Sequence, residues 1–338
     1  MNKTTTAIIE NDRETQLIVL FNLLIQTFSQ VLDGFIWIVG HIGVICVCIV
    51  FYQPAFRKSP CAIYFITSSF SQFFLFNFSV FIRMIQYGYN VPVNSLSVWF
   101  CKIRYYIFYV SSANARYNII FAGADRFLCS CREVRFRQWS SPKIALRLIV
   151  INAIVWFLFY IPVLVIFGHT NNKCRITNPN LRKFFNLYIT IENGFFPIIP
   201  MLSFGLLTIR NIRRSIQRVK VTAIVDASQG VTTTRAQRKE IQLHKMLVNQ
   251  IIVYLILNIP YSVYNTYRTY FLNINSQSVS SALFDTFLNN FFYDLTYLGY
   301  TLSFPNFLLT STIFRRELKQ IIQKTIFCQH RQHIASVT

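Results

Sequence analysis

The sequence predicts an all-α protein, a seven-transmembrane helix bundle followed by a short amphipathic eighth helix on the inner membrane face. First, the 338 residues are 53% hydrophobic and only 13% charged, with a mean hydropathy of +0.40. An ordinary soluble domain is less apolar than this. Second, apolar residues recur in seven runs of about 20 residues or more, the length at which a helix crosses the hydrocarbon layer. Third, basic residues cluster in alternate connections between these runs, as the positive-inside rule expects of a multi-pass membrane protein.

Seven apolar segments define the predicted helices. In chain order they cover residues 31–52, 62–85, 98–128, 144–167, 185–209, 246–271 and 283–314. An apolar stretch from Leu17 precedes the first segment and either extends that helix or lies at the membrane interface. We therefore divide the chain into an extracellular N-terminal segment with the helix-one lead-in (1–30), a seven-helix domain (31–314), and an amphipathic helix with a cytoplasmic tail (315–338).

The basic residues predict the orientation of the chain. Most of the 33 lysines and arginines follow the first segment, separate the third from the fourth or the fifth from the sixth, or follow the seventh. This places the C-terminus inside and the N-terminus outside. Asn2 begins a candidate glycosylation sequon on that outer side. A net charge of +21 is also typical of nucleic-acid binding, but the one-sided clustering indicates a lipid bilayer as the partner instead.

The stretch after the last apolar segment has an amphipathic pattern. In "FRRELKQIIQKTIF" (314–327), apolar residues alternate with basic ones at helical spacing. This pattern predicts a helix lying on the inner membrane surface. Cys328, just beyond it, is a candidate palmitoylation site.

Two of the eight cysteines stand apart from the others. Six lie within predicted helices or on the inner side, where disulfides rarely persist. Only Cys101, which opens the third segment, and Cys174, in the loop after the fourth, fall on the oxidising side. We therefore predict a disulfide bond that pins this loop over the mouth of the bundle. Metal binding is the alternative, but no His or Cys cluster with ligand spacing accompanies either residue, so no metal and no cofactor is predicted.

An acid and a base stand side by side at the end of the third segment, in "FAGADRFLCS" (121–130). Seven helices, an outer N-terminus, the Cys101–Cys174 pair and Asp125-Arg126-Phe127 together resemble the rhodopsin-like (class A) G-protein-coupled receptors. Arg126 follows Cys101 by 25 residues, the spacing of that family's signature arginine, although Phe127 replaces the usual tyrosine. The resemblance implies a plasma-membrane receptor, not an enzyme, that binds an extracellular ligand and activates a heterotrimeric G protein.

Further positions match the family one by one. Trp156 and Pro162 match its helix-four tryptophan and a frequent nearby proline, Pro260 and Pro305 match its helix-six and helix-seven prolines, and Phe314 matches the phenylalanine that opens its eighth helix.

Glu240 lies 20 residues before Pro260, where many family members carry the acid that pairs with the helix-three arginine. The resemblance implies that Asp125 and Glu240 hold Arg126 in the inactive state. Agonist would then open the cytoplasmic ends of helices three and six, so that Arg126 meets the G protein. Arrestin and a receptor kinase are further implied partners. In the simpler interpretation, Asp125 and Arg126 only mark the membrane boundary.

The relay between ligand and G protein departs from the family pattern. Val44, Gln72 and Phe304–Leu308 replace the residues that usually hold a sodium ion, and Asn258 replaces the helix-six tryptophan. We therefore expect no sodium regulation, because the site lacks a carboxylate. With these replacements the chain resembles divergent invertebrate orphan or chemosensory-like receptors. The stretch "RKSPCAIYF" (57–65) resembles the corresponding part of the neuropeptide, FMRFamide-type branch.

The outer half of the bundle offers a candidate ligand pocket. Phe108 occupies the position where amine receptors carry an acid, which argues against a monoamine ligand. The candidate pocket residues are Arg83, Lys102, Arg104, Phe108, Glu192, Asp294 and Tyr297. Charges within spanning helices usually face the bundle interior, and this mixed-sign, aromatic set suits a short peptide. Alternatively, Lys102 and Arg104 snorkel to the outer interface. Arg116 lies deep in helix three, and the sequence indicates no partner for it.

Other functions remain as alternatives. A polytopic transporter would use Arg83, Arg116 and Asp294 to line a path, but the sequence shows no repeated halves. A non-signalling ligand-binding homologue of the receptors is a second alternative. An enzyme is disfavoured, because the five histidines show no metal-site spacing and no GxSxG motif is present.

Overall fold

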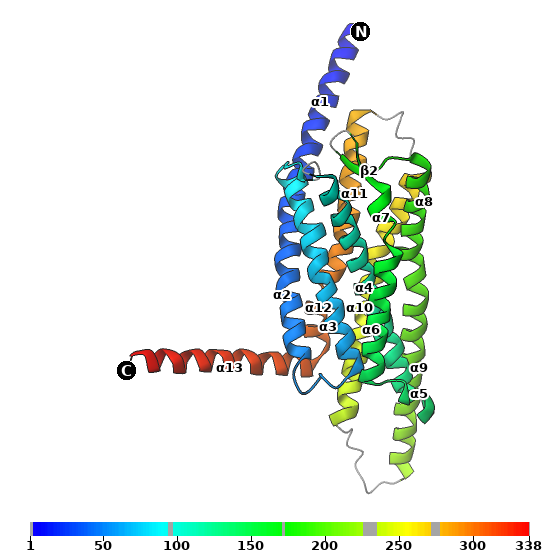
Figure 1. Ribbon diagram of the computed structural model, residues 1–338, viewed down its shortest axis with the longest axis vertical. Helices are drawn as coiled ribbons and strands as arrows, with labels where there is room; N and C mark the ends of the chain where they lie inside the picture. The colour runs from blue at the N-terminus through cyan, green and yellow to red at the C-terminus, as the bar shows by residue number, and fades with distance from the viewer. Residues whose placement is uncertain (1–2, 94–96, 171–172, 226–234, 272–277, 338) are drawn as a thin grey trace.

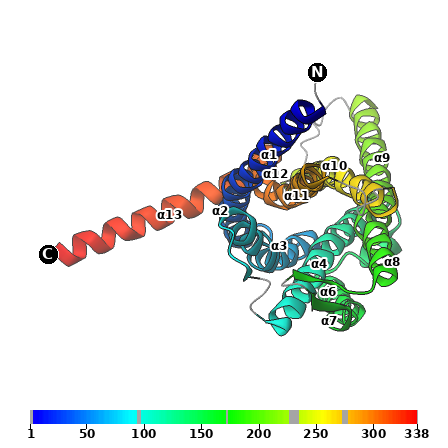
Figure 2. The same cartoon turned by 90° about the horizontal axis from the view of Figure 1, so that it is seen from above.

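The helices form one elongated bundle, with an eighth helix running sideways from near one end (Figure 1). We call this end of the bundle the inner end and the opposite one the outer end. The computed structural model describes residues 3–93, 97–170, 173–225, 235–271 and 278–337. Seen from above, the spanning helices surround a common interior (Figure 2). The predicted seven-helix bundle is confirmed, with one small β-hairpin as the departure from an all-α fold.

The first two spanning segments contain π-helical turns. The first segment is continuous from α1 (Lys3–Phe28) through η1 (Ser29–Asp33) to α2 (Gly34–Phe51). The lead-in before residue 31 therefore extends the first helix, and α1 projects beyond the bundle (Figure 1). The second segment comprises α3 (Pro60–Leu75), η2 (Phe76–Phe81) and η3 (Met84–Gly88).

The third and fourth segments are joined on the inner side by a short helix. They are α4 (Val98–Ser130), α5 (Val134–Gln138), α6 (Pro142–Phe159) and α7 (Val163–Ile166). Ser97 caps α4 by accepting a hydrogen bond from Trp99 N at 3.2 Å, and Ser141 caps α6 in the same way. Pro142 follows as the first residue of α6, where its missing N–H costs nothing.

The remaining spanning segments are longer than predicted or more interrupted. The fifth comprises α8 (Pro179–Thr190), η5 (Ile191–Phe195) and α9 (Phe196–Val225), and the sixth is α10 (Arg235–Tyr270). The seventh comprises α11 (Val279–Thr301) and α12 (Ser303–Thr310), and the eighth helix is α13 (Thr312–Val337). The predicted seventh segment ran on to residue 314, but Ser311 is extended, with φ −124° and ψ 114°, and separates α12 from α13.

Five helical stretches of the described chain are long and apolar enough to cross a membrane. They are Asp12–Phe51, Pro60–Gly88, Pro142–Ile166, Pro179–Asn211 and Glu240–Tyr270. α4 and α11 are not among them. More than half of the residues of α4 are buried, among them Arg104, Arg116, Asp125 and Arg126. An interior helix that contacts α3, α6, α9 and α10 can be this polar because its polar side chains face protein and not lipid.

The sides of the helices that point away from the bundle interior are apolar, as a lipid-facing surface must be. On α6, the side chains of Leu146, Val150, Ile154 and Phe157 are all more than half exposed. Their spacing of three or four residues places them on one face of the helix. The opposite face carries the buried side chains of Asn152 and Trp156.

The β-hairpin lies against the outer end of α4. β1 (Phe167–Thr170) pairs antiparallel with β2 (Lys173–Ile176), with His169 opposite Cys174. The predicted disulfide between Cys101 and Cys174 is confirmed, with the two Cα atoms 5.8 Å apart. The sequence prediction continued the fourth helix to residue 167 and did not foresee this hairpin.

Candidate functional site

The inner ends of α4 and α10 meet at Arg126. Its Nη2 donates to Asp125 Oδ2 at 2.5 Å, and its Nε donates to the same oxygen at 3.1 Å. Its Nη1 donates to Glu240 Oε2 on α10. The side chain of Arg126 is 3% exposed, whereas that of Glu240 is 41% exposed. Two acids therefore neutralise a buried guanidinium, and one of them reaches it from the neighbouring helix.

The residues beside Arg126 are fixed by contacts of their own. Ser140, just after α5, donates to Asp125 Oδ1 at 2.6 Å. The ring of Phe127 packs against Phe204 of α9, with centroids 6.0 Å apart. Beyond the end of α4, partial burial raises the pKa of the Cys131 thiol, which donates to Phe127 O at 3.3 Å. The inner end of α4 is therefore held by the segment after α5 and by α9.

A second contact holds α10, this time to the joint between α12 and α13. Gln242 Oε1 accepts from Ser311 Oγ and from Ile313 N, each at 2.9 Å. Gln242 Nε2 donates to Thr312 Oγ1 at 2.6 Å. A single amide thus satisfies two donors and one acceptor where the chain turns into α13.

Amide side chains connect α10 to α12 about two turns further along α10. Asn306 Nδ2 donates to Gln250 Oε1 at 3.0 Å and to Met246 O at 3.1 Å, while its Oδ1 accepts from Asn249. Gln250 in turn donates to Ser303 Oγ at 2.9 Å. This network occupies the region in which "FPNFL" departs from the motif expected of helix seven.

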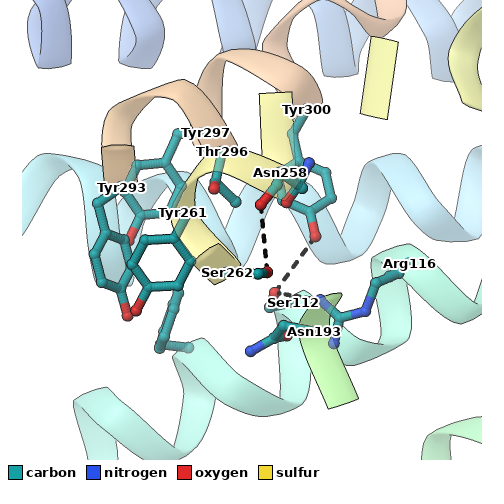
Figure 3. Close-up of a pocket in the computed structure, with 11 residues that line it drawn as sticks. Ser112, Arg116, Asn193, Asn258, Tyr261, Ser262, Tyr293, Thr296, Tyr297 and Tyr300 are labelled. Carbon is teal, nitrogen blue, oxygen red and sulfur yellow. Dashed lines mark hydrogen bonds between the residues drawn. The ribbon is translucent and has the colours of Figure 1, made fainter. Parts of the chain in front are cut away.

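A pocket lies among the inward faces of α4, α10 and α11 and the π-turn η5 (Figure 3). It encloses about 370 Å³ of space not filled by protein atoms, including the part open to solvent. The lining residues are Phe108, Ser112, Arg116, Asn193, Asn258, Tyr261, Ser262, Tyr293, Thr296, Tyr297 and Tyr300. Hydroxyl and amide groups dominate this set, Arg116 is its one charged member, and none of its members is an acid.

Arg116, for which the sequence offered no partner, pairs with Glu192. Its Nη2 lies 2.6 Å from Glu192 Oε1, and its Nη1 donates to Ser112 Oγ at 3.2 Å. Tyr160 of the fourth segment donates to Glu192 Oε2 at 2.8 Å. The pair therefore ties α4 to η5 and to the end of α6 in the interior of the bundle.

A second group of buried charges joins the first, second and seventh segments. Arg83 Nη2 lies 3.6 Å from Asp294 Oδ1 and donates to Asn290 Oδ1 at 3.0 Å. Asp33 of η1 lies close enough to Arg83 and Asp294 to interact electrostatically, but neither of its carboxylate oxygens has a hydrogen-bond partner in the described chain, and neither aspartate is exposed. Two buried carboxyl groups therefore lie near one guanidinium, and Asp294 is the one within ion-pair distance. The face of Arg83 also covers the ring of Tyr293, 4.8 Å from its centroid.

The structure separates the seven candidate pocket residues. Phe108 and Tyr297 line the pocket, and Glu192 lies behind Arg116. Arg83 and Asp294 pair on the far side of Tyr293 and Tyr297. The two remaining residues are near the outer end of α4, where Arg104 is buried and donates to Phe78 O at 3.2 Å, and Lys102 approaches the ring of Trp99 at 5.8 Å.

The tryptophan, the prolines and the phenylalanine that match the family pattern lie in separate parts of the bundle. Trp156 is buried and donates to Asn152 Oδ1 at 2.9 Å, and Pro162 precedes α7. Pro260 lies inside α10, Pro305 lies inside α12, and the ring of Phe314 is fully buried at the start of α13. Asn2 and the side chain of Cys328 lie outside the described residues. Within the described part of the chain, no three His, Cys, Asp or Glu side chains are grouped to hold a metal ion.

The family model of 7 transmembrane receptors (rhodopsin family) matches residues 43–302, which include every residue of the pocket and the Arg126–Glu240 contact. The chain is a rhodopsin-family receptor. Receptors of this family sit in the plasma membrane and respond to extracellular ligands through G proteins, without catalysis. No curated relative matches this receptor.

Sequence reasoning about the receptor missed several interior residues. Asp33 lies within an apolar run, where an isolated acid is itself a signal of an interior role. Tyr160 and Asn306 gave no such signal, because a tyrosine or an asparagine in a helix is compatible with many surroundings. The partnership of Arg116 with Glu192 was missed because η5 is a π-helical turn, and such a turn alters which side chains face inward.

Proposed function

We propose that this receptor has its N-terminus outside and its C-terminus in the cytoplasm, and that it binds an extracellular ligand in the pocket of Figure 3. Ligand binding would open the inner ends of α4 and α10 and so activate a heterotrimeric G protein. The proposed ligand is a short peptide or a fragment with similar chemistry, in keeping with the resemblance to invertebrate neuropeptide receptors. Arrestin and a receptor kinase are proposed as later partners of the opened inner face.

One observation carries this proposal: the same two helices line the pocket and hold Arg126. α4 carries Arg116 in the pocket wall and Arg126 at the inner end, ten residues or about 15 Å further along. α10 carries Asn258 in the pocket wall and Glu240 at the inner end, about 27 Å away. Any change in how α10 packs at the pocket is therefore transmitted along one continuous helix.

The Arg126–Glu240 contact is weak enough to open. Glu240 is 41% exposed, and a partly exposed ion pair contributes on the order of 1 kcal/mol. Arg126 keeps Asp125 as a partner when Glu240 leaves, so its buried charge is never unpaired. A ligand that prefers the open arrangement thereby shifts the population, and a bound G protein must raise ligand affinity by the same factor.

Nucleotide exchange on Gα tests the proposal. Purified full-length receptor in lipid nanodiscs is combined with heterotrimeric G proteins of several Gα classes, and GTP uptake is measured without ligand. Glu240→Gln should raise basal exchange about fivefold, the effect of roughly 1 kcal/mol on a two-state equilibrium. Adding Arg126→Ala should abolish that increase.

Arg268→Gln serves as the matched control for this experiment. It removes another ion-paired arginine, at the outer end of α10, 2.7 Å from Asp285. It should leave basal exchange unchanged. If Glu240→Gln gives no exchange above the rate without receptor for every Gα class, the receptor does not signal in the proposed way.

A further inference from the structure

The buried ion pair between Arg116 and Glu192 is satisfied on one side only. Glu192 Oε1 accepts from Arg116 and Oε2 accepts from Tyr160, so both oxygens of the acid have donors. Arg116 Nη1 and Nη2 are also bonded, but its Nε donates to no acceptor in the described chain although it is buried. A buried donor without an acceptor is unfavourable, and most acutely so when the group is charged.

The unsatisfied partner is the one that lines the pocket. Arg116 is in the pocket wall beside Ser112 and Asn193, whereas neither Glu192 nor Tyr160 lines it (Figure 3). Among the described residues, no carboxylate side chain contributes to the lining. A ligand therefore meets one cation and a set of neutral hydroxyl and amide groups. An ammonium group would find no acid there to replace its hydration, whereas a carboxylate would meet the positive charge of the Arg116 guanidinium.

The rest of the wall is aromatic. The rings of Tyr261 and Tyr293 lie 4.4 Å apart at their centroids, Tyr293 and Tyr297 lie 5.7 Å apart, and Phe108 and Tyr293 lie 6.3 Å apart. This cluster offers edges and faces against which an aromatic ring can pack. The pocket thus combines an anion-recognising group with a surface for an aromatic body.

We propose that the pocket binds a carboxylate attached to an aromatic body, with Arg116 as the residue that recognises the carboxylate. This inference rests on the proposed role of the pocket as the ligand site and specifies its chemistry. The same chemistry occurs in a free aryl-alkanoic acid and in a peptide that ends in a free aromatic residue. A peptide with an amidated C-terminus lacks the charge and is disfavoured.

Glu192 does not prevent this binding. A guanidinium presents its donors along two edges, so one arginine can contact two carboxylates. The hydrogen bond from Tyr160 holds Glu192 on the side away from the pocket. A ligand carboxylate that pairs with Arg116 competes with Glu192 for the guanidinium, so the ion pair between α4 and η5 weakens. Ligand binding in the pocket would thereby change how these two segments pack.

Binding of matched acids and amides tests the proposal directly. The probes are 3-phenylpropionate with 3-phenylpropanamide, and N-acetylphenylalanine with its amide, the second pair representing a peptide C-terminus. Full-length receptor in nanodiscs is titrated by calorimetry. At least one acid should bind about tenfold or more tightly than its amide, because a charge-assisted hydrogen bond to a desolvated arginine is lost in the amide. The pair that shows the preference identifies the source of the carboxylate.

The variant Arg116→Gln/Glu192→Gln removes both charges, so that no unpaired charge is left buried. It should unfold near the wild-type temperature and lose the preference for acids. The control Arg268→Gln/Asp285→Asn neutralises a different ion pair, outside the pocket lining, and should keep the preference.

Three results would overturn the proposal. They are equal binding of acid and amide in both probe pairs, absence of binding by both acids, and an acid preference that persists without Arg116. Calorimetry needs no G protein, so these results leave the basal exchange of Glu240→Gln untouched. Conversely, acid-selective binding in a receptor that never promotes exchange would overturn the signalling proposal alone.

Discussion

Gln242 on α10 and Ser311, the residue between α12 and α13, are joined by a hydrogen bond of 2.9 Å, so the inner part of α10 is attached to the junction with the eighth helix as well as to Arg126. Outward movement of α10 must break this bond together with those from Ile313 and to Thr312. The position of α10 in this structure is therefore stabilised by two groups of contacts on opposite sides of the helix, of which the Gln242 group is neutral.

We expect Gln242→Ala to raise ligand-free nucleotide exchange severalfold. Each lost hydrogen bond is worth about 0.5–1.5 kcal/mol, and the proposed outward movement of α10 would break these bonds. Exchange on Gα with nanodisc receptor measures the effect, with Gln323→Ala on the exposed face of α13 as the control. Because Gln242 and Glu240 share no partner, combining Gln242→Ala with Glu240→Gln should give a roughly additive free-energy change. Unchanged exchange in Gln242→Ala would show that α10 opens without breaking these bonds.

The charge group of Asp33, Arg83 and Asp294 should respond unequally to removal of its members. Arg83→Gln leaves two buried acids without a cation and should destabilise the receptor by about 3–5 kcal/mol. Asp33→Asn removes one of two neighbouring like charges and should be neutral or stabilising. Thermal unfolding in nanodiscs distinguishes the two. A large loss of stability in Asp33→Asn would mean that both acids are needed to balance Arg83.

Loss of the disulfide should destabilise the outer face. Cys101 and Cys174 are separated by 73 residues, and cross-links of this kind typically contribute about 2–4 kcal/mol. Cys174→Ser should therefore lower the unfolding temperature and free the β1–β2 hairpin from α4. Hydrogen exchange of the hairpin amides measures the second effect. Cys46→Ser, which changes an unbonded cysteine, is the control and should leave both quantities as they are.

Asn306→Ala should loosen α12 from α10. It removes the donor to Gln250 and the acceptor for Asn249, and unsatisfied buried amides cost about 1–3 kcal/mol each. We expect a lower unfolding temperature together with raised basal exchange. Gln250→Ala in the same background should cost less than it does alone, because its partner is already gone. If the free-energy changes of Asn306→Ala and Gln250→Ala simply add, the two amides do not stabilise the receptor as one network.

The sequence was sufficient for the parts of the fold that depend on composition. Long apolar runs and one-sided basic residues predicted seven helices, and cysteine placement predicted the disulfide. The pairing of Arg126 with Glu240 was expected from a resemblance, and the structure places the two side chains in contact. The helices and the disulfide follow from local spacing and compartment alone, whereas the Arg126–Glu240 contact required the comparison with a family.

The interior partnerships were not predictable in the same way. Asp33, Arg83 and Glu192 lie in or beside π-helical turns, which shift the faces that a regular helix would present. The partner of Arg116 depends on that shift. The position of α4 in the interior allows it to be polar. This position depends on how all its neighbours pack, so the sequence of α4 alone does not predict it.

Pro260 gives α10 a mechanical property that its continuity alone does not reveal. A proline inside a helix removes one backbone hydrogen bond and crowds the preceding turn, so the helix bends most easily there. Pro260 lies between the pocket residues Asn258 and Tyr261, with about 30 Å of helix between it and Glu240. The pocket therefore lies at the point where the helix bends, and a tilt of about 10° at Pro260 displaces the Glu240 end of α10 by about 5 Å.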